Sequence, residues 1–127
     1  MILSIIIPAY NEEKTIIKIL EKIKNNSSDF FKYEVIVIDD ASTDQSRKLL
    51  EDNKHLYDKL LVNETNKGKG FSVKRGISSA SGTHVIFQDA DLEYNPGDFK
   101  KFVLILMLME LSAQDLCTQT SHVLTTF

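Results

Sequence analysis

The sequence predicts an α/β fold in which a mostly parallel sheet is flanked by helices. Apolar runs without polar alternation recur at residues 2–7, 35–38 and 85–87, as is typical of strands buried on both faces. Segments of helical periodicity lie between these runs, and turn-forming or acidic residues follow each run. Such alternation of strands and helices favours parallel strands joined by right-handed crossovers.

The first connection is expected to be an amphipathic helix over residues 14–25. Ile16, Leu20 and Ile23 share one face of this helix, whereas the lysines of the segment point outward. A single apolar face is what a helix needs in order to pack on a sheet.

The second connection is expected to begin after the strand at residues 35–38. Ser42 and Gln45 have the spacing of a capping box. They predict the start of a helix that carries Leu49 and Leu50.

The third connection combines a loop with a helix. A weaker strand at residues 59–62 precedes the loop NETNKGKG. After this loop, Val73, Ile77 and Ala80 form an apolar stripe at helical spacing, and the last core strand follows at residues 85–87. The whole order describes half of a doubly wound sheet.

The composition describes one domain and excludes several classes of protein. The chain of 127 residues carries 15 Lys and Arg against 18 Asp and Glu, for a net charge of -3. It therefore has no basic field for a nucleic-acid backbone. Cys117 is the single cysteine, which excludes an internal disulfide and a thiolate metal cage. A metal ion would need oxygen or histidine ligands.

The apolar segments are too short to cross a membrane. The longest unbroken stretch covers residues 102–109, whereas a spanning helix needs roughly 18 or more. The first residues lack the basic leader of a signal peptide. We therefore expect a cytoplasmic protein, with peripheral association at the inner face of a membrane left open. Exposure of 102–109 would favour a homo-oligomer.

The chain divides at Lys101, because no Lys or Arg follows it and threonines gather near the end. We assign residues 1–101 to the recognisable half of the domain and 102–127 to an apolar helix continuation with an atypical tail. Two interpretations of the tail stay open. It is either a threonine-rich closing strand or a terminus unrelated to the fold, from truncation or a shifted reading frame.

Polar residues gather where the apolar runs end. Ligands of open parallel sheets bind beyond the carboxyl ends of the strands, so these residues are expected to converge on one rim. The four clusters are Pro8-Ala9-Tyr10-Asn11-Glu12, Asp39-Asp40, Lys67-Gly68-Lys69-Gly70 and Asp89-Ala90-Asp91.

The last cluster contains a candidate metal site. Asp89 and Asp91 leave an extended backbone on the same side, and Glu93 continues the series. Three carboxylates suit Mg²⁺ or Mn²⁺, which would take further ligands from water and a diphosphate. An isolated Asp-x-Asp is better explained as a solvated turn, but the acidic end of a second strand favours the metal site.

Asp39 and Asp40 end a strand that is expected to be buried, where an unpartnered carboxylate is costly. One of the two can cap the next helix together with Ser42. We expect Asp39 to accept an N–H group from a nucleobase. Tyr10 would stack on that base, and Glu12 would either accept from ribose hydroxyls or interact with a helix dipole.

The loop NKGKGFS departs from the P-loop pattern, because the Lys of Gly-Lys is not followed by Ser or Thr. Gly68 and Gly70 still allow the backbone to approach a ligand, and Lys69 would neutralise a diphosphate. A solvated lysine is the alternative. No nucleophile elbow is present, and the three histidines lack metal-ligand spacing.

Four segments together are more specific than any one of them. SIIIPAYNEEKTI, YEVIVIDDASTDQS, NKGKGFSVKRGISSASG and VIFQDADLEYNPGDF occur in this order from residue 4 to about residue 100. In order and spacing they resemble the inverting family 2 glycosyltransferases of GT-A fold, especially the dolichyl- or polyprenyl-phosphate sugar transferases. The resemblance implies a Rossmann-like GT-A sheet, here apparently truncated.

The resemblance also implies residue roles. The implied nucleotide-binding residues are Pro8, Ala9, Tyr10, Glu12, Val37, Asp39, Lys69, Asp89 and Ala90. Asp89 and Asp91 would form the DxD element that holds Mg²⁺ or Mn²⁺, with Glu93 as a third ligand.

The implied reaction transfers a sugar from a UDP- or GDP-sugar to a polyprenyl phosphate or a glycan hydroxyl, with inversion. The metal would stabilise the departing nucleoside diphosphate. A hydroxyl acceptor needs a general base, which an ionised phosphate does not. No base can be assigned, because the acceptor half of the family is not recognisable after Lys101. The alternatives are a non-catalytic nucleotide-sugar-binding or oligomeric assembly module and a receiver or phosphatase that forms an aspartyl-phosphate.

Overall fold

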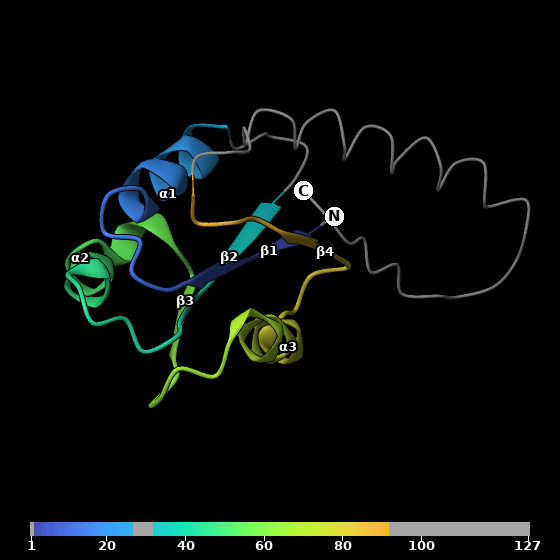
Figure 1. Cartoon of the computed structure of the whole chain (residues 1–127). Helices are drawn as coiled ribbons and strands as arrows, with labels where there is room; N and C mark the ends of the chain where they lie inside the picture. Colours follow the sequence, from blue (N-terminus) through green and yellow to red (C-terminus); the bar gives the residue numbers. More distant parts are fainter. Residues whose placement is uncertain (1, 27–31, 92–127) are drawn as a thin grey trace, which may run out of the picture.

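The computed structural model describes residues 2–26 and 32–91, which form a parallel sheet with helices on both faces (Figure 1). Its elements, in chain order, are β1 (Ile2–Ala9), α1 (Ile16–Asn25), β2 (Lys32–Asp39), α2 (Ser46–Asp52), the 3-10 helix η1 (Lys54–Leu56), β3 (Lys59–Val62), α3 (Lys69–Ser79) and β4 (His84–Phe87). The expectations for Glu93 and for residues 102–127 lie outside the described residues. No helix within these two ranges is long and apolar enough to span a bilayer.

The four strands are parallel and lie in the order β3-β2-β1-β4. Ile6 of β1 pairs with Ile36 of β2 on one side and with Phe87 of β4 on the other. This order confirms the predicted mostly parallel α/β sheet. It also brings the carboxyl ends of β1, β2 and β4 to one edge, because neighbouring strands run in the same direction.

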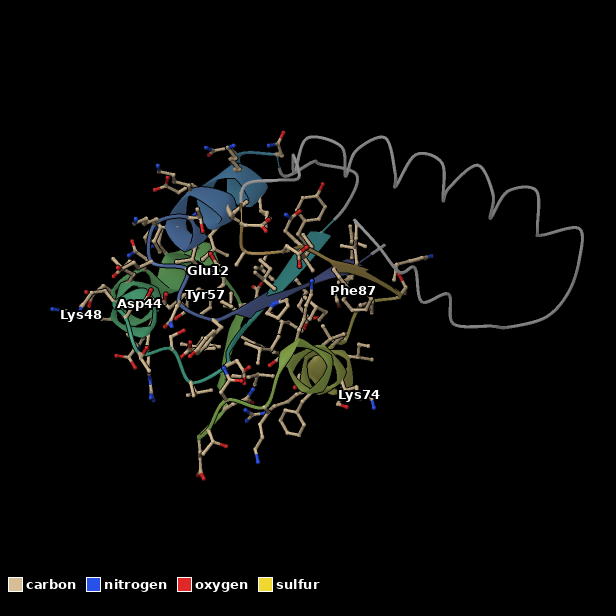
Figure 2. All side chains as sticks on the ribbon, in the orientation of Figure 1. Glu12, Asp44, Lys48, Tyr57, Lys74 and Phe87 are labelled. Atoms are coloured by element: carbon tan, nitrogen blue, oxygen red, sulfur yellow. The ribbon has the colours of Figure 1, made fainter. Side chains whose placement is uncertain are left out.

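The central strands are buried on both faces, which explains their unbroken apolar runs. Ile5 and Ile7 of β1 belong to the core cluster beneath α1 and α2. Ile6 belongs with Ile36 and Ile38 to a second cluster on the α3 side. α1 and α2 therefore cover one face of the sheet and α3 covers the other (Figure 1). Charged side chains such as Lys48 and Lys74 point outward from the helices (Figure 2).

α3 packs on the sheet through small residues. Gly76 is buried, and a Cβ atom at this position would lie 2.5 Å from Ile6 Cγ2 and 2.9 Å from Ile38 Cδ1. Val73 and Ile77, which the sequence places at the centre of the buried face, are only half-buried. The predicted stripe was therefore displaced by one position, because a glycine contributes nothing to a hydrophobic pattern.

The capping box predicted for the second connection was wrong. α2 begins at Ser46, and the N–H group of Ser46 donates to Asp44 Oδ1 over 2.9 Å. The hydroxyl oxygen of Ser42 instead accepts a hydrogen bond from the N–H group of Asn11 over 3.0 Å. The helix exists with Leu50 buried, but Ser42 joins the ends of two strands and does not cap it.

Candidate functional site

A pocket of about 340 Å³ opens at the edge where β1, β2 and β4 end. Its lining residues are Pro8, Ala9, Tyr10, Glu12, Asp40, Lys69, Ser72, Asp89, Ala90 and Asp91. All of them except Ser72 belong to the four clusters that the sequence indicates, and each cluster is represented, so the expected convergence on one rim is confirmed. Asp40 and Ser72 were not among the predicted binding residues.

Asn11 ties the end of β1 to the loop after β2. Its φ of 52° lies in the left-handed region, which Asn tolerates better than most residues. Asn11 Oδ1 accepts hydrogen bonds from the N–H groups of Thr43 over 2.8 Å and Asp44 over 3.2 Å. The preceding residue, Tyr10, stays 45% exposed at the pocket. Its ring is therefore available for contact with a ligand.

Glu12 lies between the loop after β2 and the start of α1. Its N–H group donates to Ser46 Oγ over 2.8 Å, and its carbonyl oxygen accepts from Ile16 N–H over 2.9 Å. The Thr15 hydroxyl lies 2.6 Å from the carbonyl oxygen of Ala90 and 3.2 Å from Glu12 Oε2. The first turn of α1 is thus joined to the segment after β4. Glu12 lines the pocket and also stands near a helix start, so both interpretations of its role fit this position.

Asp39 is fully buried at the end of β2 and does not line the pocket. Its Oδ1 atom accepts a hydrogen bond from Ser42 N–H over 3.3 Å, whereas Oδ2 has no partner among the described residues. A buried oxygen without a donor is costly, and native structures contain few of them. Asp39 thus contacts the loop backbone at Ser42 through one oxygen, and its other oxygen is open to a donor from a ligand.

Asp40 has a different set of partners. It is 4% exposed, and its carboxylate accepts from Lys67 N–H over 2.8 Å, Gly68 N–H over 2.9 Å and the Asn63 amide over 2.8 Å. Burial alone would raise the pKa of Asp40, but these three hydrogen bonds outweigh it and hold the pKa below its ordinary value. Neither Asp39 nor Asp40 therefore caps α2, which begins at Ser46.

Lys69 and Asp89 form an ion pair across the pocket. The Lys69 side chain is 65% exposed, so the pair contributes little to stability. No group of three or more His, Cys, Asp or Glu residues in the described ranges could hold a metal ion. Asp89 and Asp91 nevertheless supply two carboxylates to the pocket, and Mg²⁺ characteristically combines one or two carboxylates with waters and phosphate oxygens. The donor set thus fits a hard divalent cation.

Val37 is a nucleotide-binding residue only by the resemblance, and that role stays a prediction. It is fully buried in the core cluster beneath α1 and does not line the pocket. Its register explains this burial, because Val37 pairs with Ile7 two positions before the end of β2. A valine there completes the core.

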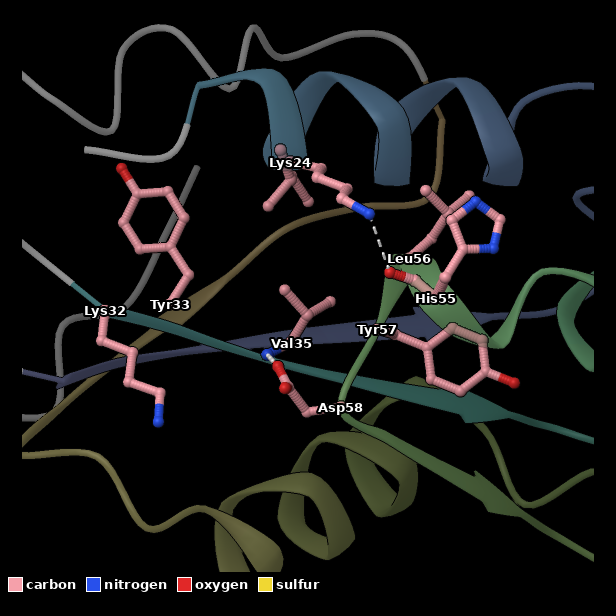
Figure 3. Close-up of a pocket in the computed structure, with 9 residues that line it drawn as sticks. Lys24, Lys32, Tyr33, Val35, His55, Leu56, Tyr57 and Asp58 are labelled. Atoms are coloured by element: carbon pink, nitrogen blue, oxygen red, sulfur yellow. Dashed lines mark hydrogen bonds between the residues drawn. The ribbon is translucent and has the colours of Figure 1, made fainter. Parts of the chain in front are cut away.

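A second cavity of about 320 Å³ lies at the opposite edge, near the amino ends of β2 and β3 (Figure 3). Two of its polar groups contact the backbone: Lys24 Nζ donates to the carbonyl oxygen of His55 over 3.2 Å, and Asp58 Oδ2 accepts from Val35 N–H over 2.7 Å. Because ligands of such sheets bind at the carboxyl edge, the pocket between Tyr10 and Asp91 is the candidate site.

Comparison with known proteins identifies relatives of the chain. The model of the family described as Glycosyl transferase family 2 matches residues 4–107. An undecaprenyl-phosphate 4-deoxy-4-formamido-L-arabinose transferase of Proteus mirabilis is 35% identical over 104 residues, which are 79% of this chain and 32% of that protein. A dolichyl-phosphate beta-glucosyltransferase of Dictyostelium discoideum is 35% identical over 94% of this chain and 40% of that protein. The chain thus spans about a third of the length of one relative and two fifths of the other.

Solved structures show the same architecture. S. aureus TarS 1-349 in complex with UDP has a TM-score of 0.73 and 29% identity, over 87% of this chain and 33% of that one. The mannosyltransferase PcManGT of Pyrobaculum calidifontis, in complex with GDP-Man and Mn²⁺, has a TM-score of 0.63 and 30% identity, over 76% of this chain and 29% of that one. The sheet is therefore of the GT-A, Rossmann-like type that the four motifs predict. With the family model covering most of its length, this chain belongs to glycosyl transferase family 2.

Proposed function

We propose that the pocket at the carboxyl edge binds a nucleotide-sugar donor and that the chain supplies the donor half of an inverting glycosyltransferase. One observation carries the proposal. The carboxylates of Asp89 and Asp91 and the ammonium of Lys69 line one pocket at the carboxyl edge of the sheet, in a chain that the glycosyl transferase family 2 model matches. A donor of this class has a base, a diphosphate and a sugar, and each needs its own partners.

The base would be held near Asp39 and Tyr10. Uracil and guanine each present an N–H group, which would supply the donor that Asp39 Oδ2 lacks among the described residues. The exposed Tyr10 ring would stack on the base, and Glu12 would accept from the ribose hydroxyls. We place UDP ahead of GDP as the donor nucleotide. TarS has been solved with UDP and PcManGT with GDP-Man, so related structures support both choices.

The diphosphate would lie beside Asp89, Asp91 and Lys69. The two aspartates would hold Mg²⁺ or Mn²⁺, and Ala90 lies between them in the chain. When bound, the cation carries part of the negative charge of the leaving nucleoside diphosphate. Lys69 adds a positive charge at the same place, because its ammonium already contacts Asp89. Glu93 remains a proposed third ligand, outside the described residues.

The acceptor is proposed to be a polyprenyl phosphate. The Proteus relative is named for undecaprenyl phosphate and the Dictyostelium relative for dolichyl phosphate. An ionised phosphate can attack the anomeric carbon without a general base. A glycan hydroxyl is the other acceptor class. Lipid-linked acceptors would bring a cytoplasmic protein to the inner face of a membrane.

Thermal unfolding of the chain with UDP and GDP, each with and without Mn²⁺, tests the donor site. We expect one nucleotide to raise the unfolding temperature, with a larger shift when Mn²⁺ is present. Asp91→Ala should remove the metal-dependent part of the shift. Asp52→Ala, which removes an exposed carboxylate from α2, is the matched control and should keep it. Equal shifts with and without Mn²⁺ would contradict the metal site.

Product formation from a radiolabelled sugar nucleotide separates transferase from binding module. Turnover with a polyprenyl phosphate would support the enzyme. Nucleotide binding with no turnover would favour the alternative of a non-catalytic nucleotide-sugar-binding or assembly module. Self-association through residues 102–109 belongs to that alternative and stays a prediction, because the segment lies outside the described residues.

A further inference from the structure

The start of α3 follows a loop in which residues 64–67 are exposed. Gly68 adopts a φ of 91°, which L side chains rarely adopt, and no atom lies within 4 Å of the place where its Cβ would be. The next residue, Lys69, begins α3 and forms the ion pair with Asp89. Side-chain packing at Gly68 therefore does not fix the loop, and hydrogen bonds must contribute to where Lys69 lies.

Asp40 supplies those contacts. Its Oδ1 atom accepts the N–H group of Lys67 and its Oδ2 atom accepts that of Gly68, the two residues directly before α3. Both oxygens are thus occupied by the loop, and the residue is almost completely buried. Asp40 lines the pocket, but its hydrogen bonds are made to the protein.

Asn63 extends the same network to β3. Its amide nitrogen donates to Asp40 Oδ1 over 2.8 Å and to Ser72 Oγ, in the first turn of α3, over 3.0 Å. Its Oδ1 atom accepts from Arg75 Nη1 over 2.8 Å, and Arg75 Nη1 also donates to the carbonyl oxygen of Val62 over 2.6 Å. The ends of β2 and β3 and the first turns of α3 therefore form one hydrogen-bonded unit.

We propose that Asp40 is a positioning residue that fixes Lys69 and the first turn of α3 next to the carboxylates after β4. The inference rests on the proposed donor site and gives the two neighbouring aspartates different roles. Asp39 would serve the base, whereas Asp40 acts on the phosphate side through the backbone of Lys67 and Gly68. Its effect should therefore appear for ligands that carry a diphosphate and be absent for a nucleoside alone.

Asp40→Asn tests this division because it keeps the shape of the side chain. The asparagine side chain has one oxygen and one NH₂ group, and the NH₂ group cannot accept a hydrogen bond. One of the two hydrogen bonds from Lys67 N–H and Gly68 N–H should therefore be lost, and the loop should loosen. With Mn²⁺ present, we expect the affinity for UDP, or for GDP if that is the nucleotide bound, to fall by about tenfold, a loss of about 1.4 kcal/mol. The affinity for the matching nucleoside, measured by NMR titration, should stay within about twofold.

Glu34→Gln is the matched control. Glu34 is also a buried carboxylate that accepts several hydrogen bonds, but it lies at the amino end of β2, far along the strand from the pocket. This variant should unfold at a lower temperature yet keep the wild-type affinity for the nucleoside diphosphate. An equal loss of affinity in Asp40→Asn and Glu34→Gln would overturn the positioning role, because both would then act through general stability.

Amide hydrogen exchange of the free protein separates this inference from the proposed function. Exchange at residues 67–72 should be faster in Asp40→Asn and unchanged in Glu34→Gln. Unchanged exchange in Asp40→Asn, or an equal loss of nucleoside and nucleoside diphosphate binding, would overturn the inference. A wild-type chain that binds no nucleotide would contradict the donor site and the phosphate-side effect, while faster exchange would still support the contact between Asp40 and the loop.

Discussion

The two edges of the sheet each contain a buried carboxylate on β2, but among the described residues only the carboxyl edge leaves buried polar atoms without a partner. At the amino edge, Glu34 accepts from Ser4 Oγ over 2.6 Å, from Ser81 N–H over 2.8 Å and from Ser81 Oγ over 2.7 Å. Lys59 completes the set with an ion pair of 3.0 Å. At the carboxyl edge, Asp40 is similarly occupied, whereas Asp39 Oδ2 has no partner in the described ranges.

The difference between the satisfied Glu34 and the incompletely satisfied Asp39 indicates which residue serves stability and which serves binding. A fully satisfied buried network contributes to the fold and has no capacity left for a ligand. An incomplete one is costly in the free protein and gains from a ligand that completes it. Substitution of Glu34 should therefore change unfolding and leave binding alone, and substitution of Asp39 should do the reverse.

The largest expected effect is at Gly82, on the amino edge. A Cβ atom there would lie 2.4 Å from Ser4 Oγ and 2.8 Å from the backbone oxygen of Ile2. Gly82→Ala should therefore lower the free energy of unfolding by roughly 2–3 kcal/mol, measured by denaturant titration. Gly70→Ala is the control, because nothing lies within 4 Å of its Cβ position in α3, and it should be at least as stable as the wild type. Equal stability of the two variants would contradict the close packing at Gly82.

Glu34 comes next, and its charge makes the effect depend on pH. Burial alone would raise its pKa, but hydrogen bonds from Ser4 and Ser81 and the contact with Lys59 lower the pKa from 4.5 to about 2. Because the folded pKa is the lower one, the stabilisation is complete above about pH 4.5 and is lost as the pH falls towards 2. Glu34→Gln should cost roughly 2–3 kcal/mol at pH 7.

Urea titrations at pH 7, 4 and 2.5 check this prediction. The difference in the free energy of unfolding between wild type and Glu34→Gln should shrink as the pH is lowered. A difference that stays constant across this range would show that the charge of Glu34 is not what stabilises the amino edge.

The sequence predicted the strands better than it predicted the polar contacts between them. Runs such as residues 2–7 identify buried parallel strands, because burial on both faces leaves no room for polar alternation. Parallel order then brings the strand ends together, which is why Tyr10, Lys69 and Asp89 were found in one pocket. This part of the site follows from topology alone.

The network around Asp40 could not be predicted in the same way. Asp39 and Asp40 are chemically identical, and which one faces the loop after β3 depends on a turn with Ala41 in a left-handed conformation. Asn63 and Ser72 have no motif of their own, since their partners lie 23 and 9 positions away in the chain. Val37 is buried in the core, and its predicted contact with the nucleotide rests on the resemblance alone, which does not distinguish core from pocket on a strand buried on both faces.

Asp39 should show the reverse of the Glu34 behaviour. Asp39→Asn removes a charge whose Oδ2 atom has no partner in the described part of the chain, so we expect the free energy of unfolding to change by less than about 1 kcal/mol. The affinity for the nucleoside diphosphate should nevertheless fall by about tenfold or more, because an amide nitrogen cannot accept the N–H group of the base. Isothermal calorimetry with the nucleoside diphosphate measures the change. Strong destabilisation with unchanged binding would assign Asp39 to the fold.

The smallest expected effect concerns backbone strain, which is also confined to the carboxyl edge in the described residues. The two non-glycine residues with positive φ there are Asn11 and Ala41, at 52° and 58°, and both lie in loops that follow strands of the pocket. Alanine has no side-chain oxygen to offset this conformation. Ala41→Gly should therefore raise the free energy of unfolding by about 0.5–1 kcal/mol, after the greater flexibility of glycine in the unfolded chain is subtracted.

Ala80→Gly is the control, because Ala80 has an ordinary φ of -72° at the end of α3 and its replacement should only destabilise. Strain is retained in proteins chiefly where the surrounding structure requires it, and functional sites are the usual place. The orientation of Asp39 and Asp40 depends on the turn at Ala41, so a glycine that relaxes the turn should also weaken nucleotide binding slightly. A more stable variant with undiminished binding would show that the strain does not serve the site, and a less stable one would show that Ala41 is not strained.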